Sequence, residues 1–119
     1  MTDIHPIYNN QFGVAFQCKR ASLRDIKRIQ LVFRDTGLLL SYDELLLFSK
    51  NILHTRKNSP LCEDCKESEQ CKALLVNSPA SQITFAMNVK ELDAIQDLVE
   101  GTLFQLKLDN FLSGICKSD

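Results

Sequence analysis

The residues best suited to chemistry are three cysteines within ten positions. Cys62 and Cys65 form a C-x-x-C pair, and Cys71 follows after five more residues. A C-x-x-C pair can place two sulfurs around one metal ion, and thiolate is a soft ligand that suits Zn²⁺ or an iron–sulfur cluster. Three thiolates leave a tetrahedral zinc ion one ligand short. The spacing therefore predicts a fourth ligand from elsewhere in the chain.

Three residues outside the cluster are candidates for this fourth ligand. Cys18 is the first choice, because it ends a predicted strand at a point where the chain turns. Cys116 is the second choice, and His54, eight positions before Cys62, is the third. The predicted structural zinc site therefore consists of Cys18, Cys62, Cys65 and Cys71.

Other uses of the cluster stay open at this point. The C-x2-C-x5-C spacing resembles part of the auxiliary-cluster motif of radical-SAM accessory domains, which implies an iron–sulfur cluster, although the next ligand of that motif is missing here. A redox-active thiol pair and plain metal-free thiols are further alternatives. The sequence has no P-loop and no G-x-G-x-x-G, H-E-x-x-H or G-x-S-x-G motif. We therefore expect a non-enzymatic binding or regulatory module rather than an enzyme.

The composition of the segment that carries the cysteines, about residues 55–80, also favours a metal site. Its only large aliphatic side chains are those of Leu61, Leu74, Leu75 and Val76. A connection of this length in a small domain usually needs something to order it. A metal ion can do so, because its binding energy then contributes to folding.

The first third of the chain predicts an antiparallel meander. Apolar residues alternate over 12–18 and again over 29–34, which is typical of half-buried strands. A turn with Gly37 available for a positive φ leads to a short strand at 38–40. A fourth strand is predicted over 83–87, and residues 72–76 are predicted to add a short helical turn.

Two capping boxes predict the main helices. Ser41 with Glu44 begins a helix over about 42–54, and Asn88 with Glu91 begins a second apolar helical stripe. Gly101 lies inside that second stripe and indicates a kink or close packing. A last turn or separate short helix is expected to carry Phe111, Leu112 and Ile115.

The two strand–cap–helix stretches match with a constant offset of 47 residues, for example Ser41 with Asn88 and Leu45 with Leu92. This match suggests a β–α pseudo-repeat, with both helices side by side on one face of a shared sheet. We predict a single α+β domain over residues 1–119. In it, an antiparallel sheet of about four strands packs against two main helices.

Composition and charge exclude several classes of protein. The chain has 119 residues, 45% hydrophobic and 24% charged, which excludes disordered, collagen-like and membrane proteins. The net charge is −1, but residues 1–60 carry +4 and residues 61–119 carry −5. The basic residues of the 19–34 segment make a nucleic-acid-associated module an alternative function. They are Lys19, Arg20, Arg24, Lys27, Arg28 and Arg34.

The expected compartment is the cytoplasm. No secretory signal is visible, and the apolar runs are far shorter than the roughly 18 residues that span a bilayer. In a reducing compartment clustered cysteines indicate metal or redox chemistry, and an odd number of five fits poorly with full disulfide pairing. The expected partner is an unknown protein or a second copy, through an exposed sheet or helix face, and no membrane.

Taken together, several short motifs resemble a family of small uncharacterised bacterial proteins. The residues that carry this resemblance are Cys18, the stretch Leu40-Ser41 with Glu44 and Phe48, the C-x2-C-x5-C cluster, and Phe85, Met87, Asn88, Glu91 and Leu92. The resemblance implies a small cytoplasmic protein without assigned activity, and it supplies no catalytic residues.

Overall fold

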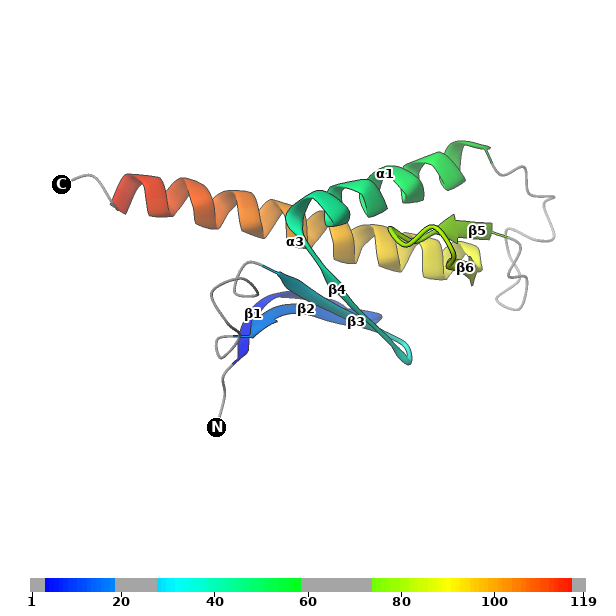
Figure 1. The fold of residues 1–119 in the computed structure, drawn as a ribbon, viewed down its shortest axis with the longest axis horizontal. Coiled ribbons are helices and arrows are strands. Elements are labelled where there is room, and N and C mark those ends of the chain that lie inside the picture. Colours follow the sequence, from blue (N-terminus) through cyan, green and yellow to red (C-terminus); the bar gives the residue numbers. More distant parts are fainter. Residues whose placement is uncertain (1–3, 19–27, 59–73, 117–119) are drawn as a thin grey trace.

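The computed structural model describes residues 4–18, 28–58 and 74–116 (Figure 1). The side chains of Cys18 and of residues 113–116 are outside that description. The elements are, in chain order, β1 (Ile4–Asn9), β2 (Gly13–Cys18), β3 (Ile29–Phe33), β4 (Thr36–Leu40), α1 (Tyr42–Asn58), β5 (Leu74–Asn77), β6 (Thr84–Met87) and α3 (Val89–Cys116). Neither described helix is long and apolar enough to cross a membrane.

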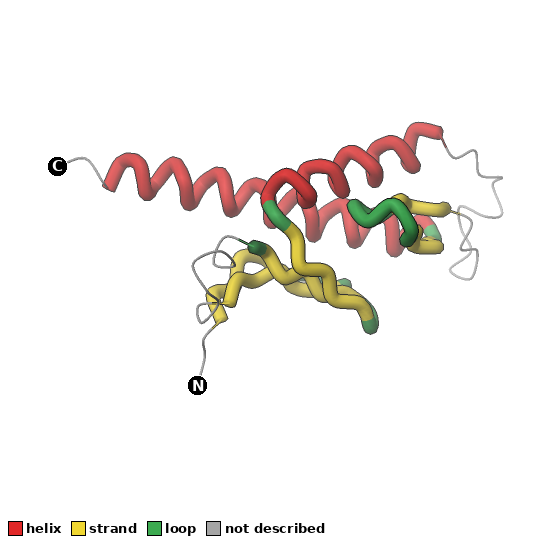
Figure 2. The backbone as a smooth tube through the Cα atoms, in the orientation of Figure 1, coloured by secondary structure: helices red, strands yellow, loops and turns green. Residues whose placement is uncertain are grey.

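The predicted α+β class is confirmed. Strands β1 to β4 form one antiparallel sheet in sequence order, β5 and β6 form a separate antiparallel hairpin, and α1 and α3 pack against both (Figure 2). The predicted strand near 83–87 exists as β6, but it belongs to the hairpin. The fourth strand of the main sheet is β1, which the apolar pattern does not predict because Pro6 and an irregular register between Pro6 and Tyr8 hide its alternation.

The alternation in β3 decides which face of the sheet packs on the helices. Ile29, Leu31 and Phe33 are buried, whereas Gln30 and Val32 are only half-buried on the other face. The turn to β4 differs from the prediction: Arg34 takes the positive φ, 52°, and Gly37 lies within β4. A two-residue hairpin turn needs a positive φ at this place in the chain, whichever residue stands there.

Both capping boxes form as predicted. The backbone N–H of Glu44 donates to Ser41 Oγ at 3.2 Å, and that of Ser41 donates to Glu44 Oε1 at 2.8 Å. The same reciprocal pair joins Asn88 and Glu91 at 2.7 and 3.1 Å. Helix α1 continues to Asn58, beyond the predicted end near 54, because the Asn58 side chain donates to the His54 carbonyl oxygen at 3.0 Å.

Helix α3 runs unbroken through Gly101 to Cys116, so of the two alternatives expected around Phe111 the last turn is confirmed and the separate short helix is wrong. Of the two roles considered for Gly101, the structure supports close packing. A Cβ atom at this position would collide with the ring of Tyr8, which lies against the helix. The missing side chain therefore lets β1 approach α3 directly.

Residues 74–77 form strand β5, so the helical turn predicted over 72–76 is wrong in the part that is described. Leu74 and Val76 are buried, and they pair with Met87 and Phe85 of β6. A run of three apolar residues has no period of its own, so the pairing partner decides between strand and helix.

The core joins the sheet, the hairpin and both helices. The rings of Phe33 and Phe85 lie edge to face with centroids 5.2 Å apart, and Phe85 is 6.0 Å from Phe48 of α1. The expected shared sheet is wrong, because β4 precedes α1 in the main sheet whereas β6 precedes α3 in the hairpin. The capped helices match locally, but strand pairing is decided by contacts that are distant in sequence.

Candidate functional site

The predicted zinc ligands lie mostly outside the described residues. Cys18 ends β2, where its backbone pairs with Ile4 at the start of β1. Cys62, Cys65 and Cys71 fall in the 59–73 connection, which the structure does not describe. Within the ranges 4–18, 28–58 and 74–116, no three His, Cys, Asp or Glu side chains gather in a way that could hold a metal ion. The four-cysteine site therefore stays a prediction.

The two alternative ligands lie at different ends of the molecule. Cys116 is the last residue of α3. His54 is exposed near the end of α1, and its Nδ1 lies 3.1 Å from the side-chain nitrogen of Asn58. His54 is thus the nearer of these two candidates, along the chain, to the 59–73 connection.

Both ends of that connection are held together. Thr55 Oγ1 near the end of α1 donates to the carbonyl oxygen of Leu75 in β5 at 3.0 Å. One helical turn earlier, Asn51 Nδ2 donates to the carbonyl oxygen of Asn77 at 2.9 Å. The end of α1 and the start of β5 therefore lie at the same end of the molecule (Figure 1).

The basic segment is described only at Arg28 and beyond. Arg28 Nη1 lies 3.8 Å from Glu44 Oε1 in the first turn of α1. Arg34 Nη1 lies 3.3 Å from Glu91 Oε2 in the first turn of α3, and its guanidinium is 5.8 Å from the Phe12 ring centre. Both arginines thus face carboxylates of this chain.

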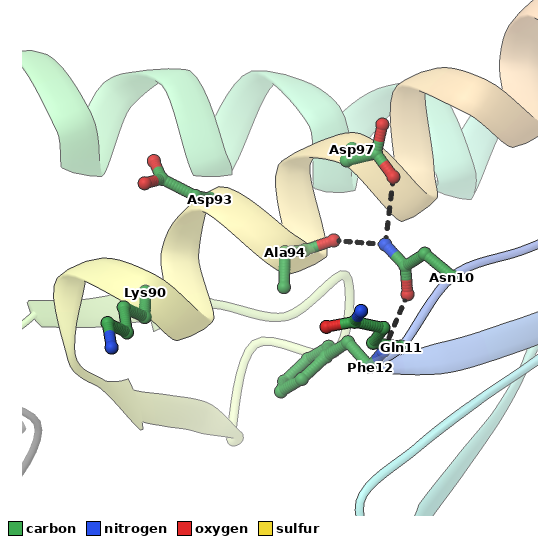
Figure 3. Close-up of a pocket in the computed structure, with 7 residues that line it drawn as sticks. All are labelled: Asn10, Gln11, Phe12, Lys90, Asp93, Ala94 and Asp97. Atoms are coloured by element: carbon green, nitrogen blue, oxygen red, sulfur yellow. Dashed lines mark hydrogen bonds between the residues drawn. The ribbon is translucent and has the colours of Figure 1, made fainter.

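One open pocket of about 340 Å³ lies between the β1–β2 turn and the first half of α3 (Figure 3). It is lined by Asn10, Gln11, Phe12, Lys90, Asp93, Ala94 and Asp97. The Asn10 amide nitrogen donates to the Ala94 carbonyl oxygen and to Asp97 Oδ2, both at 2.9 Å. Its oxygen accepts from the backbone N–H groups of Phe12 and Gly13 at 2.8 and 3.1 Å.

The pocket carboxylates are engaged as well. Tyr8 donates its hydroxyl to Asp97 at 3.1 Å, and Asp93 Oδ1 lies 2.6 Å from Arg56 Nη2 of α1. The pocket contains no serine, cysteine or histidine that could act as a nucleophile or proton carrier. The hydrogen bonds from Asn10 to Ala94 and Asp97 form a clamp that holds the β1–β2 turn on α3. The only sequence signal for it is the polar run Asn9-Asn10-Gln11, which is typical of a turn.

Because the Tyr8 hydroxyl donates to Asp97 in the clamp, the pKa of Tyr8 reports whether this contact is formed. The hydrogen bond to Asp97, desolvation and the negative charge of Asp97 all raise the pKa of Tyr8 above its ordinary value of 10.0. A raised pKa means that the contact favours folding at neutral pH and that this contribution is lost as pH rises through the Tyr8 pKa. In a Tyr42→Phe background, ultraviolet titration should show the Tyr8 phenol ionising above its usual pH, and adding Asp97→Asn should lower that pKa. An unchanged titration after Asp97→Asn would contradict the contact.

The described surface also carries two unusual apolar areas. The open face of the main sheet holds Ile4, Pro6, Val14, Phe16, Val32 and Leu39, none of which belongs to the core or packs against it. The second area is on α3, where Phe104, Leu108, Phe111 and Leu112 are exposed. Antiparallel sheets with a solvated face usually carry polar residues there, and contiguous apolar patches mark interaction sites.

Comparison of the chain with protein-family models, with curated proteins and with solved structures finds no match. The resemblance to small bacterial proteins therefore stays a prediction.

Proposed function

We propose that this chain is a small non-enzymatic binding module whose 59–73 connection is ordered by one Zn²⁺ ion. The observation that carries this proposal is the pair of hydrogen bonds, Thr55 to Leu75 and Asn51 to Asn77, that brings the two ends of the connection together. A closed connection confines the three thiols it carries to a small volume, and a metal ion can then order the segment at a lower entropic cost.

Chain length limits how far the thiols can be from the anchors. Cys62 is four residues from Asn58, and Cys71 is three residues from Leu74. At roughly 3.3–3.6 Å per extended residue, their Cα atoms lie within about 14 and 11 Å of these anchors. Cys65 lies between the other two cysteines in the chain, so all three can meet at this end of the molecule.

The same limit favours His54 as the fourth ligand. Cys116 is remote, because Leu74 pairs with Met87 just before α3, and Cys116 lies about 40 Å further along that helix. Cys18 pairs with Ile4, and β1 starts on the opposite side of the molecule from β5 in Figure 1. Zinc would be held by the Cys62, Cys65 and Cys71 thiolates and by His54, whose imidazole is exposed one turn before the connection.

The polar side chains of the pocket support binding rather than catalysis, because they already have partners within the chain. In the described pocket, the side chains of Asn10, Asp93 and Asp97 are engaged in holding elements together. By contrast, Ile4 and Leu39 on the open sheet face and the four apolar residues on α3 are exposed. We place the protein in a reducing compartment, the cytoplasm, where the thiolates would stay available to zinc.

Metal analysis of the freshly purified full chain tests the proposal. We expect about one zinc per chain, with Cys62→Ser losing the metal and lowering the thermal midpoint, because the connection is then no longer ordered. His54→Gln should weaken zinc binding in a chelator competition, whereas the matched variants Cys18→Ser and Cys116→Ser should leave it unchanged.

The other outcomes identify a different fourth ligand, a different metal or the absence of a metal site. Zinc loss from Cys18→Ser but not from His54→Gln would make Cys18 the fourth ligand, as first predicted from the sequence. Iron with visible absorbance would replace zinc by an iron–sulfur cluster. Protein that binds neither metal, yet shows the same thermal midpoint with and without added zinc, would overturn the proposal.

A further inference from the structure

The C-terminal half of α3 extends beyond the rest of the molecule. With 28 residues the helix is about 42 Å long, whereas the 17 residues of α1 span about 26 Å. Among the α3 side chains that the structure describes, Leu103 is the last buried one, and Figure 1 shows the helix continuing past the sheet and past α1 toward its C-terminus. A helical end without tertiary contacts is only marginally stable in water.

This projecting half carries a continuous apolar stripe. Phe104 and Phe111 are each 64% exposed, Leu112 is 47% exposed and Leu108 is 37% exposed. Their spacing of i, i+4, i+7 and i+8 places them on one face of the helix. Leu106, which packs against the core, points in nearly the opposite direction from Leu108, because each residue turns the helix by about 100°. The stripe is therefore separate from the core-facing side of α3.

We propose that this stripe is the interface between two copies of the chain, with the α3 helices paired antiparallel around Leu108. In that pairing Phe104 of one copy lies opposite Leu112 of the partner subunit. The two globular parts then lie toward opposite ends of the helix pair. The proposal is independent of the zinc site, since none of the metal ligands takes part.

The net charge and the exposed apolar area of the stripe both fit a second copy of the chain as its binding partner. Between residues 104 and 112 the only charged side chains are Lys107 and Asp109, so this part of the helix has no net charge and two copies do not repel each other. With roughly 200 Å² for a whole aromatic side chain, the four stripe residues expose on the order of 400 Å² in each copy.

A symmetric pair would therefore bury on the order of 800 Å² from the stripes alone. The polar residues Gln105, Lys107 and Asp109, which flank the stripe on the helix surface, form the rim. They bring the total near the lower end of specific interfaces, about 1,200 Å². An interface of this size predicts a dimer that dissociates on dilution in the micromolar range.

Sedimentation equilibrium of the full chain, over a dilution series and with reductant to prevent disulfide links, tests this interface. The wild type should change from dimer to monomer on dilution. The double variant Phe104→Glu/Phe111→Glu should weaken self-association by at least about 100-fold, because each buried ring at the centre of the interface is replaced by a charge. Its helical circular dichroism and thermal midpoint in dilute solution should match those of the wild type.

The matched control is Leu75→Glu, which alters a side chain that is 60% exposed on β5, away from the stripe, and should leave association unchanged. If the double variant fails to fold, the single variant Phe111→Gln, which keeps a good helix former, replaces it. A wild type that stays monomeric at the highest concentration would overturn the proposal. Association that is lost in Leu39→Glu but kept in the α3 variants would assign the dimer to the open sheet face instead.

Discussion

Phe33→Ala should destabilise the protein by about 3–5 kcal/mol, enough to lower the urea midpoint by about 1 M or more. Phe33 is only 1% exposed, and its ring stacks on Phe12 at 5.6 Å and meets Phe85 edge to face at 5.2 Å. Truncation removes both ring contacts and leaves a cavity between the main sheet and the hairpin. The sheet and the β5–β6 hairpin share no hydrogen-bonded strand, so apolar contacts such as that of Phe33 with Phe85 connect them.

The same chain offers a matched control for this truncation. Phe111→Ala removes an identical side chain that is 64% exposed, so it should change the free energy of unfolding by less than about 0.5 kcal/mol. All proteins are compared by urea denaturation at the same low concentration, at which the proposed dimer is dissociated. Equal losses for Phe33→Ala and Phe111→Ala would show that the Phe33 cluster is not the centre of the core.

The second large effect is expected at the start of β2. Gly13→Ala should cost about 3 kcal/mol, because the new Cβ would collide with the carbonyl oxygen of Val32 and approach the Cβ of Phe33 to 2.9 Å. Gly13 cannot move away easily. Its carbonyl oxygen accepts from the backbone N–H of Asn10 at 3.0 Å, and its own N–H donates to the Asn10 side chain at 3.1 Å. Relief of the collision would break either the turn or the pairing with β3.

Gly37→Ala is the control for this substitution, since it makes the same change in β4 of the same sheet. Its Cβ would meet Gln30 Nε2 at 3.2 Å, which is the far end of a flexible side chain that can turn away. The free energy of unfolding should then stay within about 1 kcal/mol of the wild type. Thermal or urea denaturation of the two variants checks the contrast, and a Gly13→Ala protein as stable as Gly37→Ala would contradict the close β2–β3 packing.

The clamp around Asn10 and Asp97 explains why the described pocket is a poor candidate for catalysis. A catalytic group needs a side chain that is free to bind or exchange a proton with a substrate. Here the Asn10 amide makes four hydrogen bonds within the chain, and Asp97 accepts from both Asn10 and Tyr8. Among the described residues, exposed apolar side chains such as Leu39 and Phe111 are better placed to bind a partner.

The cysteine cluster shows which ligands of a metal site can be predicted from a sequence motif alone. Its spacing predicts a metal ligand set without any knowledge of the fold, because C-x-x-C geometry is local. The fourth ligand is different, since it depends on which distant residue reaches the cluster. The place of Cys18 at a strand end favours it from the sequence, whereas the proposal of His54 depends on the pairing of β1 with β2 and on the contact of α1 with β5.

The amino-acid sequence by itself determined those features that depend on neighbouring residues. The reciprocal hydrogen bonds of Ser41 with Glu44 and of Asn88 with Glu91 join residues three apart, so both helix starts were predictable. The alternation in β3 likewise encodes its buried face without reference to the rest of the chain.

Only the tertiary structure decided the features that depend on distant contacts. Strand β1 forms because β2 pairs with it, and α3 passes through Gly101 without a break because Tyr8 packs there. The apolar pattern of α3 continues from Leu92 to Leu112, yet only its first half meets a core. Periodicity along a helix records which residues are apolar, whereas the neighbouring elements determine which of them are covered, and this leaves the Phe104–Leu112 stripe at the surface.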